Sequence, residues 1–123
     1  MSNNIKPEMS RALIKMAGVA KQDYQRFWSR ADGGQISEFA QNQLDNFMES
    51  LEFNSGSKYI KVIRNDGNQR MVWGFIVNSE TDSKFKYGDI LKAAGWAAPA
   101  RNAARGNVFE DLSWVKWTGP AYL

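Results

Sequence analysis

The residues of this sequence best suited to binding chemistry are five cations between positions 84 and 105. They are Lys84, Lys86, Lys92, Arg101 and Arg105, and Asp89 is the only carboxylate among them. Arginine offers a planar fork of N–H donors that holds phosphate with two hydrogen bonds, and lysine adds a compact positive charge. This composition indicates a surface for anions, and nucleic acid is the anion that we expect.

Trp96 lies within the same stretch, in the string GWAAPARNAARGN (95–107), which is otherwise rich in small residues. If Pro99 begins a short helix, Arg101 and Arg105 share one face and Asn102 lies beside them. The small residues would let a ligand backbone approach, and the indole ring would stack on a base. The predicted nucleic-acid-binding residues are therefore Lys84, Lys86, Lys92, Trp96, Arg101, Asn102 and Arg105.

Two other interpretations of this stretch stay open. In the first, the alanines form a helix that only connects two strands, the arginines are solvated or paired with Glu110 and Asp111, and the tryptophan is buried. In the second, the ligand is small and bears a phosphate, and Arg101, Asn102 and Arg105 line its pocket. The local sequence does not distinguish these two interpretations from the prediction of nucleic-acid binding.

The residues usually needed for catalysis are scarce. The chain has neither His nor Cys, which removes the commonest general base and every thiol nucleophile, disulfide and thiolate ligand. It has no phosphate loop, dinucleotide fingerprint, zinc-protease motif or serine-hydrolase motif. Asp89 with Glu110 and Asp111 is a carboxylate set for a divalent cation, but turn and surface roles explain these residues better. We expect a protein without enzymatic activity, metal or cofactor.

The charge of the chain is unevenly distributed. Residues 1–56 hold six Lys or Arg against seven Asp or Glu, whereas residues 57–123 hold ten against six. The basic character thus belongs to the part that contains the predicted site. No segment approaches the roughly 18 apolar residues of a membrane span, and the N-terminus lacks an apolar signal segment. We expect one domain over 1–123, located in the cytoplasm and without membrane association.

Apolar residues recur at steps of three and four over 7–30 and again over 35–52, with Gly33-Gly34 between the two segments. This spacing predicts two amphipathic helices. Because the connection is short, residues 1–56 are predicted to form an antiparallel helical hairpin. Its aromatic residues suit either the core or a contact with a second copy or with a host protein.

The apolar period changes to two after Gly56. KYIKVIR (58–64) and RMVWGFIVN (70–78) are predicted strands, joined by a hairpin turn at Asp66-Gly67. Alternation places Trp73 with Phe75 on one face of the second strand. Since its other face is also apolar, we expect this strand to be central, and Gly74 indicates a bulge or a close backbone approach.

Further extended segments complete the second half of the chain. Gly88 supplies a turn before a strand that contains Ile90 and Leu91, and short strands are predicted within 106–110 and 113–119. The fold class that we expect is α+β, in which an N-terminal two-helix hairpin packs on a small curved antiparallel β-sheet or SH3-like barrel formed by 57–123.

The string FKYGDILKAAGWAAPARNAARGNVF (85–109), with WVKWTGPAYL (114–123), resembles segments of small uncharacterised bacteriophage proteins. The resemblance implies a phage origin and a role in host takeover, DNA handling or counter-defence in the host cytoplasm, and it implies no site residue. The leading prediction is non-catalytic binding of DNA or RNA by the basic C-terminal surface. The alternative is a protein-interaction module, or an inhibitor of a host protein, that acts through the helical hairpin.

Overall fold

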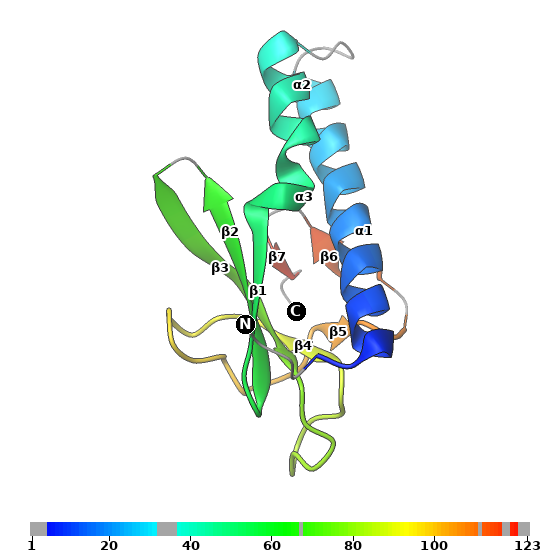
Figure 1. The fold of residues 1–123 in the computed structure, drawn as a ribbon, viewed down its shortest axis with the longest axis vertical. Helices are drawn as coiled ribbons and strands as arrows, with labels where there is room; N and C mark the ends of the chain where they lie inside the picture. Colours follow the sequence, from blue (N-terminus) through cyan, green and yellow to red (C-terminus); the bar gives the residue numbers. More distant parts are fainter. Residues whose placement is uncertain (1–4, 32–36, 67, 111, 117–118, 121–123) are drawn as a thin grey trace.

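The structure is a computed structural model that describes residues 5–31, 37–66, 68–110, 112–116 and 119–120. Its helices are α1 (Pro7–Ala31), α2 (Glu38–Asp45) and α3 (Phe47–Ser50). Its strands are β1 (Leu51–Ser55), β2 (Tyr59–Asp66), β3 (Gln69–Val77), β4 (Asp89–Leu91), β5 (Gly106–Asn107), β6 (Val115–Lys116) and β7 (Gly119–Pro120). The predicted α+β class is confirmed (Figure 1).

Five strands form an antiparallel sheet in the order β1-β2-β3-β4-β5, and β6 and β7 form a separate pair. β3 is central, as its two apolar faces predicted. β2 and β3 form the predicted hairpin and pair as far as Asp66 and Gln69, while Gly67 lies outside the described residues. The described strands do not close into a barrel, because β1 and β5 are opposite edges of the sheet. The SH3-like barrel prediction was therefore wrong.

α1 lies across one face of the sheet (Figure 1) and covers the strands with its apolar side. The buried residues of this side recur at helical spacing and are Met9, Leu13, Met16, Ala20 and Tyr24. The β6–β7 pair lies between the helix and the sheet, since β6 contacts α1 and β7 contacts β3. The helix predicted over 7–30 is confirmed. Within the described residues, no helix has the length and apolar character needed to cross a membrane.

The two-helix hairpin predicted for 1–56 is not supported. The helix expected over 35–52 is instead two short helices separated at Asn46, and residues 51–55 form the edge strand β1. Leu51 and Phe53 are apolar at a spacing of two, which suits a strand, and pairing with β2 satisfies the backbone N–H and C=O groups that point toward β2. The connection predicted at Gly33-Gly34 lies outside the described residues.

A bulge in β3 changes which side chains share a face of the sheet. Trp73 is the extra residue of the bulge, opposite the step between residues 62 and 63 of β2. Trp73 therefore lies with Ile76 on the face toward α1, whereas Phe75 lies on the other face. The predicted grouping of Trp73 with Phe75 was wrong because one extra residue resets the alternation. The irregularity predicted at Gly74 is confirmed, and a Cβ there would meet Ile90 at 3.2 Å.

Candidate nucleic-acid interface

Residues 92–105 form a loop, so the condition that Pro99 begins a short helix is not met. The backbone N–H of Ala100 donates to Lys92 O at 2.7 Å and closes the loop on itself. Two further backbone bonds, from residues 94 and 95 to residue 98, form a turn that places Trp96 at the tip. These backbone hydrogen bonds across the loop take the place of helical ones, and the small side chains of the loop allow its two arms to pair closely.

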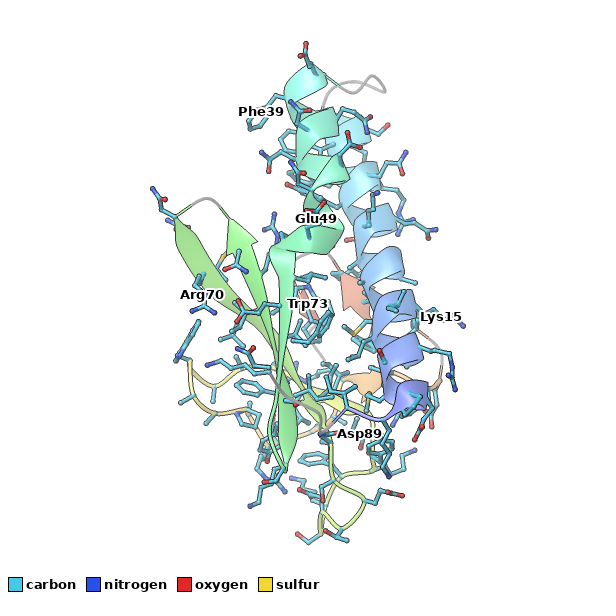
Figure 2. All side chains as sticks on the ribbon, in the orientation of Figure 1. Lys15, Phe39, Glu49, Arg70, Trp73 and Asp89 are labelled. Atoms are coloured by element: carbon cyan, nitrogen blue, oxygen red, sulfur yellow. The ribbon has the colours of Figure 1, made fainter. Side chains whose placement is uncertain are left out.

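The loop lies over the sheet face opposite α1, which we call the loop face. Its buried residues include Phe75 of β3, Leu91 of β4 and Phe85, with Ala104 of the loop packed against them. β2 contributes Tyr59 and Lys61, whose partners across the strand pair belong to the same face. Figure 2 shows Trp73 between the sheet and α1, and Arg70 on the side of the sheet away from α1.

The loop tip lies against two cations of the sheet. The Trp96 side chain is 50% exposed, and its ring centroid lies 3.6 Å from Lys61 Nζ and 5.5 Å from Arg70 Cζ. Cations at these distances are attracted by the face of an indole ring. Desolvation, followed by the charge of Arg70, lowers the pKa of Lys61. Trp96 is a surface residue, so the interpretation that buries it was wrong.

Arg70 is fixed in turn by an ion pair with Glu52 on β1. Its Nη2 atom lies 2.9 Å from both carboxylate oxygens, and Nε donates to Asn65 Oδ1 at 3.2 Å. Hydrogen bonds from Asn54 and then from Arg70 lower the pKa of Glu52. Strands β1, β2 and β3 thus hold the guanidinium group that borders Trp96.

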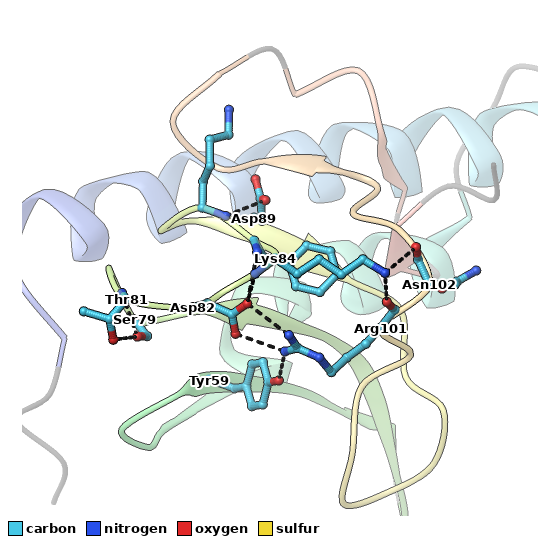
Figure 3. A network of polar contacts seen from close by, with 10 residues as sticks. Tyr59, Ser79, Thr81, Asp82, Lys84, Asp89, Arg101 and Asn102 are labelled. Atoms are coloured by element: carbon cyan, nitrogen blue, oxygen red, sulfur yellow. Dashed lines mark hydrogen bonds and ion pairs between the residues drawn. The ribbon is translucent and has the colours of Figure 1, made fainter.

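The second cluster of the loop face is centred on Arg101 (Figure 3). Its Nη1 and Nη2 atoms donate to the two oxygens of Asp82 at 3.1 and 3.0 Å, and Nη1 also donates to the Tyr59 hydroxyl. Asp82 Oδ1 accepts the backbone N–H groups of Lys84 and Phe85 as well. The Arg101 guanidinium, and then these two N–H groups, hold the pKa of Asp82 well below its usual range.

A polar pocket of about 330 Å³ opens beside this cluster. Its lining residues come from the β1–β2 turn, the start of β2, the segment after β3 and the loop. They are Lys58, Tyr59, Ser79, Thr81, Asp82, Ser83 and Arg101. Of the three residues predicted to line a small-ligand pocket, it contains Arg101 but neither Asn102 nor Arg105.

The remaining predicted cations do not gather on one surface. Lys84 Nζ donates to the carbonyl oxygens of Arg101 and Asn102 at 2.6 and 3.1 Å, which fixes the base of the loop. Lys86 Nζ forms an ion pair with Glu110 at 3.1 Å. Burial, followed by the charge of Arg105, lowers the pKa of Lys92. The structure brings Lys84, Arg101 and Asn102 together and places Lys86 and Lys92 elsewhere.

Two of the three carboxylates considered for a metal, Asp89 and Glu110, have other partners. Asp89 is buried, accepts the backbone N–H of Lys86 at 2.9 Å and accepts Asn107 Nδ2 at 3.0 Å. Glu110 pairs with Lys86, and Asp111 lies outside the described residues. In the described part of the chain, no three His, Cys, Asp or Glu side chains gather as a metal site would need.

Several residues of the loop face were not predicted as site residues. They are Glu52, Lys58, Tyr59, Lys61, Arg70 and Asp82. The alternation within KYIKVIR places Tyr59 and Lys61 on one face of a strand. No local pattern, however, indicates that residues 92–105 return to cover that face.

Sequence comparisons give this chain a family but no activity. No curated protein and no solved structure matches it. A family model matches residues 1–122, and its description names neither an activity nor a phage, so the resemblance to bacteriophage proteins stays a prediction. Because the match covers nearly the entire chain, the protein belongs to DUF7717, a family of unknown function.

Proposed function

We propose that the protein binds nucleic acid through the loop face and does not act as an enzyme. The observation that carries this proposal is the half-exposed Trp96 ring, with Lys61 Nζ 3.6 Å and Arg70 Cζ 5.5 Å from its centroid. Proteins that bind single strands combine aromatic rings, which stack on bases, with cations that follow the backbone. Because a ring stacks only on a base with an open face, unpaired DNA or RNA is the expected ligand.

The phosphates of such a strand would contact the cations around Trp96 and around Arg101. Lys58 and Lys61 form no ion pair with any carboxylate of the described residues, and Arg101 is held in a fixed orientation. Tyr59, which contacts Arg101, and Lys61, which contacts Trp96, are two positions apart on β2, so their backbone positions lie about 6.6 Å apart along the strand. One short strand would therefore reach both. Lys86, Lys92 and Arg105 stay predicted phosphate contacts, which a longer strand would reach.

Support for a role without catalysis comes from the carboxylates of this face. Ion pairs and hydrogen bonds lower the pKa of both Glu52 and Asp82. A general base works best with a pKa near the operating pH, and these two groups are shifted away from it. The chain also contains no His or Cys.

The resemblance of 85–109 to bacteriophage proteins favours a role in an infected cell. Nucleic-acid binding there would serve DNA handling, host takeover or counter-defence in the host cytoplasm. We propose this setting as the one in which the binding takes place.

The test is a titration of 3′-labelled single strands and duplexes, followed by fluorescence anisotropy at low and moderate salt. Trp96→Ala should weaken single-strand binding by about 1–3 kcal/mol, because it removes a stacked base. Phe39→Ala is the matched control, since Phe39 is 63% exposed on α2, and it should leave binding unchanged. Equal binding by Trp96→Ala and the unaltered protein would contradict the proposal.

Salt gives a second measure from the same titration. If Lys58, Lys61 and Arg101 each neutralise one phosphate, the logarithm of the binding constant should fall against log salt with a slope of about −2. Lys61→Ala should make that slope about 0.7 less steep, because one counterion fewer is released. Lys15→Ala on the outer side of α1 (Figure 2) should leave the slope unchanged. Binding that is insensitive to salt would argue against phosphate contacts.

A second candidate function is protein interaction at the C-terminal end of α1. Rings of Tyr24, Phe27, Trp28 and Phe39 follow one another at centroid distances of 5.5 to 6.4 Å. Phe27 is 36% exposed and Phe39 is 63% exposed. A second copy of the chain or a host protein would cover them. Sedimentation at increasing concentration tests self-association, which Phe39→Ser should abolish; a monomer at every concentration would leave only the host protein.

A further inference from the structure

The guanidinium group of Arg101 is held on two of its edges, and its third edge is unoccupied. Asp82 accepts from the Nη1–Nη2 edge, and Tyr59 accepts the second N–H of Nη1. The N–H of Nε and the second N–H of Nη2 then form a parallel fork. Among the described residues, none places an acceptor on that fork. Arginine forks of this kind match the spacing of phosphate oxygens.

The neighbouring groups of the pocket are also donors. Lys58 is exposed, and its ammonium group forms no hydrogen bond or ion pair with the described residues. The Tyr59 hydroxyl accepts from Arg101, so its own proton is available to a ligand. Ser79 and Thr81 hydroxyls lie 3.1 Å apart on the same wall. The positive charges of Lys58 and Arg101 exceed the negative charge of Asp82 by one.

From this arrangement we propose that the pocket binds a phosphate monoester, namely the terminal phosphate of a nucleotide or of a nucleic-acid strand. A monoester presents three terminal oxygens and about −1.5 to −2 charges at pH 7, which suits the number of donors. A pocket of about 330 Å³ also suits an end group better than a strand that continues on both sides. The inference rests on the proposed function for its choice of ligand, because Trp96 on the same face indicates a base.

The experiment compares two oligonucleotides of one sequence, one with a 5′-phosphate and one with a 5′-hydroxyl. The phosphorylated strand should bind more tightly, on the order of tenfold, because its phosphate forms charge-assisted hydrogen bonds. That difference should shrink below about pH 6, where the monoester takes up a proton and loses charge. A pH-independent difference would contradict a phosphate monoester ligand.

Two variants locate the effect. Arg101→Lys keeps the charge but removes the fork, so it should weaken binding of the 5′-phosphate strand more than binding of the 5′-hydroxyl strand, and the advantage of the 5′-phosphate should disappear. Lys58 is exposed, and its side chain forms no hydrogen bond or ion pair with the described residues. Lys58→Ala should therefore leave the fold intact, and it tests the inference even if Arg101→Lys unfolds the protein. Arg11→Lys on the exposed side of α1 is the matched control and should retain the full advantage.

The outcomes separate the inference from the proposed function. If both strands bind equally and Trp96→Ala weakens both, the phosphate pocket is wrong and the proposed function stands. If neither strand binds, but a nucleoside 5′-monophosphate raises the unfolding temperature in an Arg101-dependent way, the pocket stands and the proposed function is wrong. A phosphoserine peptide that binds more tightly than the nucleotide would overturn the inference, because the ligand would then be a protein.

Discussion

Asp82 shows how one carboxylate organises the loop face at the scale of single residues. It accepts two backbone N–H groups of its own turn and also binds Arg101, 19 residues away in the sequence. The turn role follows from sequence, since Asp is favoured in turns for such bonds. The ion pair does not, because nothing local to either residue names its partner. The charge of Asp82 therefore orients Arg101 toward the pocket.

We expect this ion pair to stabilise the fold in a pH-dependent manner. The pKa of Asp82 is lowered in the folded protein, so its stabilising contribution is present above the unfolded pKa of about 3.9 and is lost as the pH falls below that value. Asp82→Asn keeps an oxygen for the backbone N–H groups but removes the charge. Its unfolding midpoint in urea should be lower than that of the unaltered protein at pH 7, and the difference between the two midpoints should become smaller as the pH falls below about 3.9 toward the folded pKa.

Asp45→Asn provides the comparison, since Asp45 is exposed on α2 and, among the described residues, accepts a side-chain hydrogen bond from Gln41 alone. It should shift the urea midpoint little at either pH. A constant difference between Asp82→Asn and the unaltered protein from pH 7 to pH 3 would show that the charge of Asp82 is not what stabilises this turn.

Sequence identified Trp96 and Arg101 as functional candidates but not their partners. An aromatic residue and arginines among small residues are unusual for a core, and this composition indicated that the segment is a binding surface. Their partners Lys61, Arg70 and Tyr59 come from strands far along the chain, so only the fold reveals them. Lys86 and Lys92 were predicted from charge alone, and charge does not determine the direction in which a side chain points.

At the scale of elements, the turn before β4 depends on Gly88. Its φ of +89° is unfavourable for residues with a Cβ, and an added Cβ would lie 2.6 Å from the Phe109 ring. Gly88→Ala should therefore lower the free energy of unfolding by about 1–3 kcal/mol. Gly95→Ala, in the loop, adds a Cβ with nothing within 4 Å and should change stability by less than about 0.5 kcal/mol. Chemical denaturation measures both, and equal stability would contradict the role assigned to Gly88.

α1 contributes to stability through its buried side. Met16 is fully buried, so Met16→Ala should leave a cavity and cost about 2–5 kcal/mol. Ile14, two positions away on the same helix, is 65% exposed, and Ile14→Ala should cost less than about 0.5 kcal/mol. Urea unfolding distinguishes them. A large loss from Ile14→Ala would show that the outer side of α1 is covered in solution.

Elements whose apolar residues follow one clear spacing were predictable from the sequence, and the other elements were not. The long stripe of α1 and the hairpin of β2 and β3 follow from spacing and turn residues. Residues 51–55 carry apolar side chains that fit either spacing, and tertiary pairing with β2 decided for a strand. The loop of 92–105 had no period at all, and its alanines suggested a helix that the cross-loop hydrogen bonds replace.

At the scale of the whole molecule, the sheet separates two surfaces of different character. One face is covered by α1, and the other carries the loop with its cations and Trp96. Of the residues named on the loop face, Glu52 comes from residues 1–56, and the others come from the basic half of the chain. The pairing of distant strands and the side from which a loop approaches are properties of topology, which composition does not contain.

The most direct test of nucleic-acid binding by the loop face is a ¹H–¹⁵N NMR titration with a short single strand. The indole Nε1–H of Trp96 and the amides around Tyr59, Lys61, Asp82 and Arg101 should shift first and furthest, while the amides of α1 and α2 stay in place. Shifts centred on the aromatic rings of α1 and α2, or no shifts at all, would contradict the proposed function.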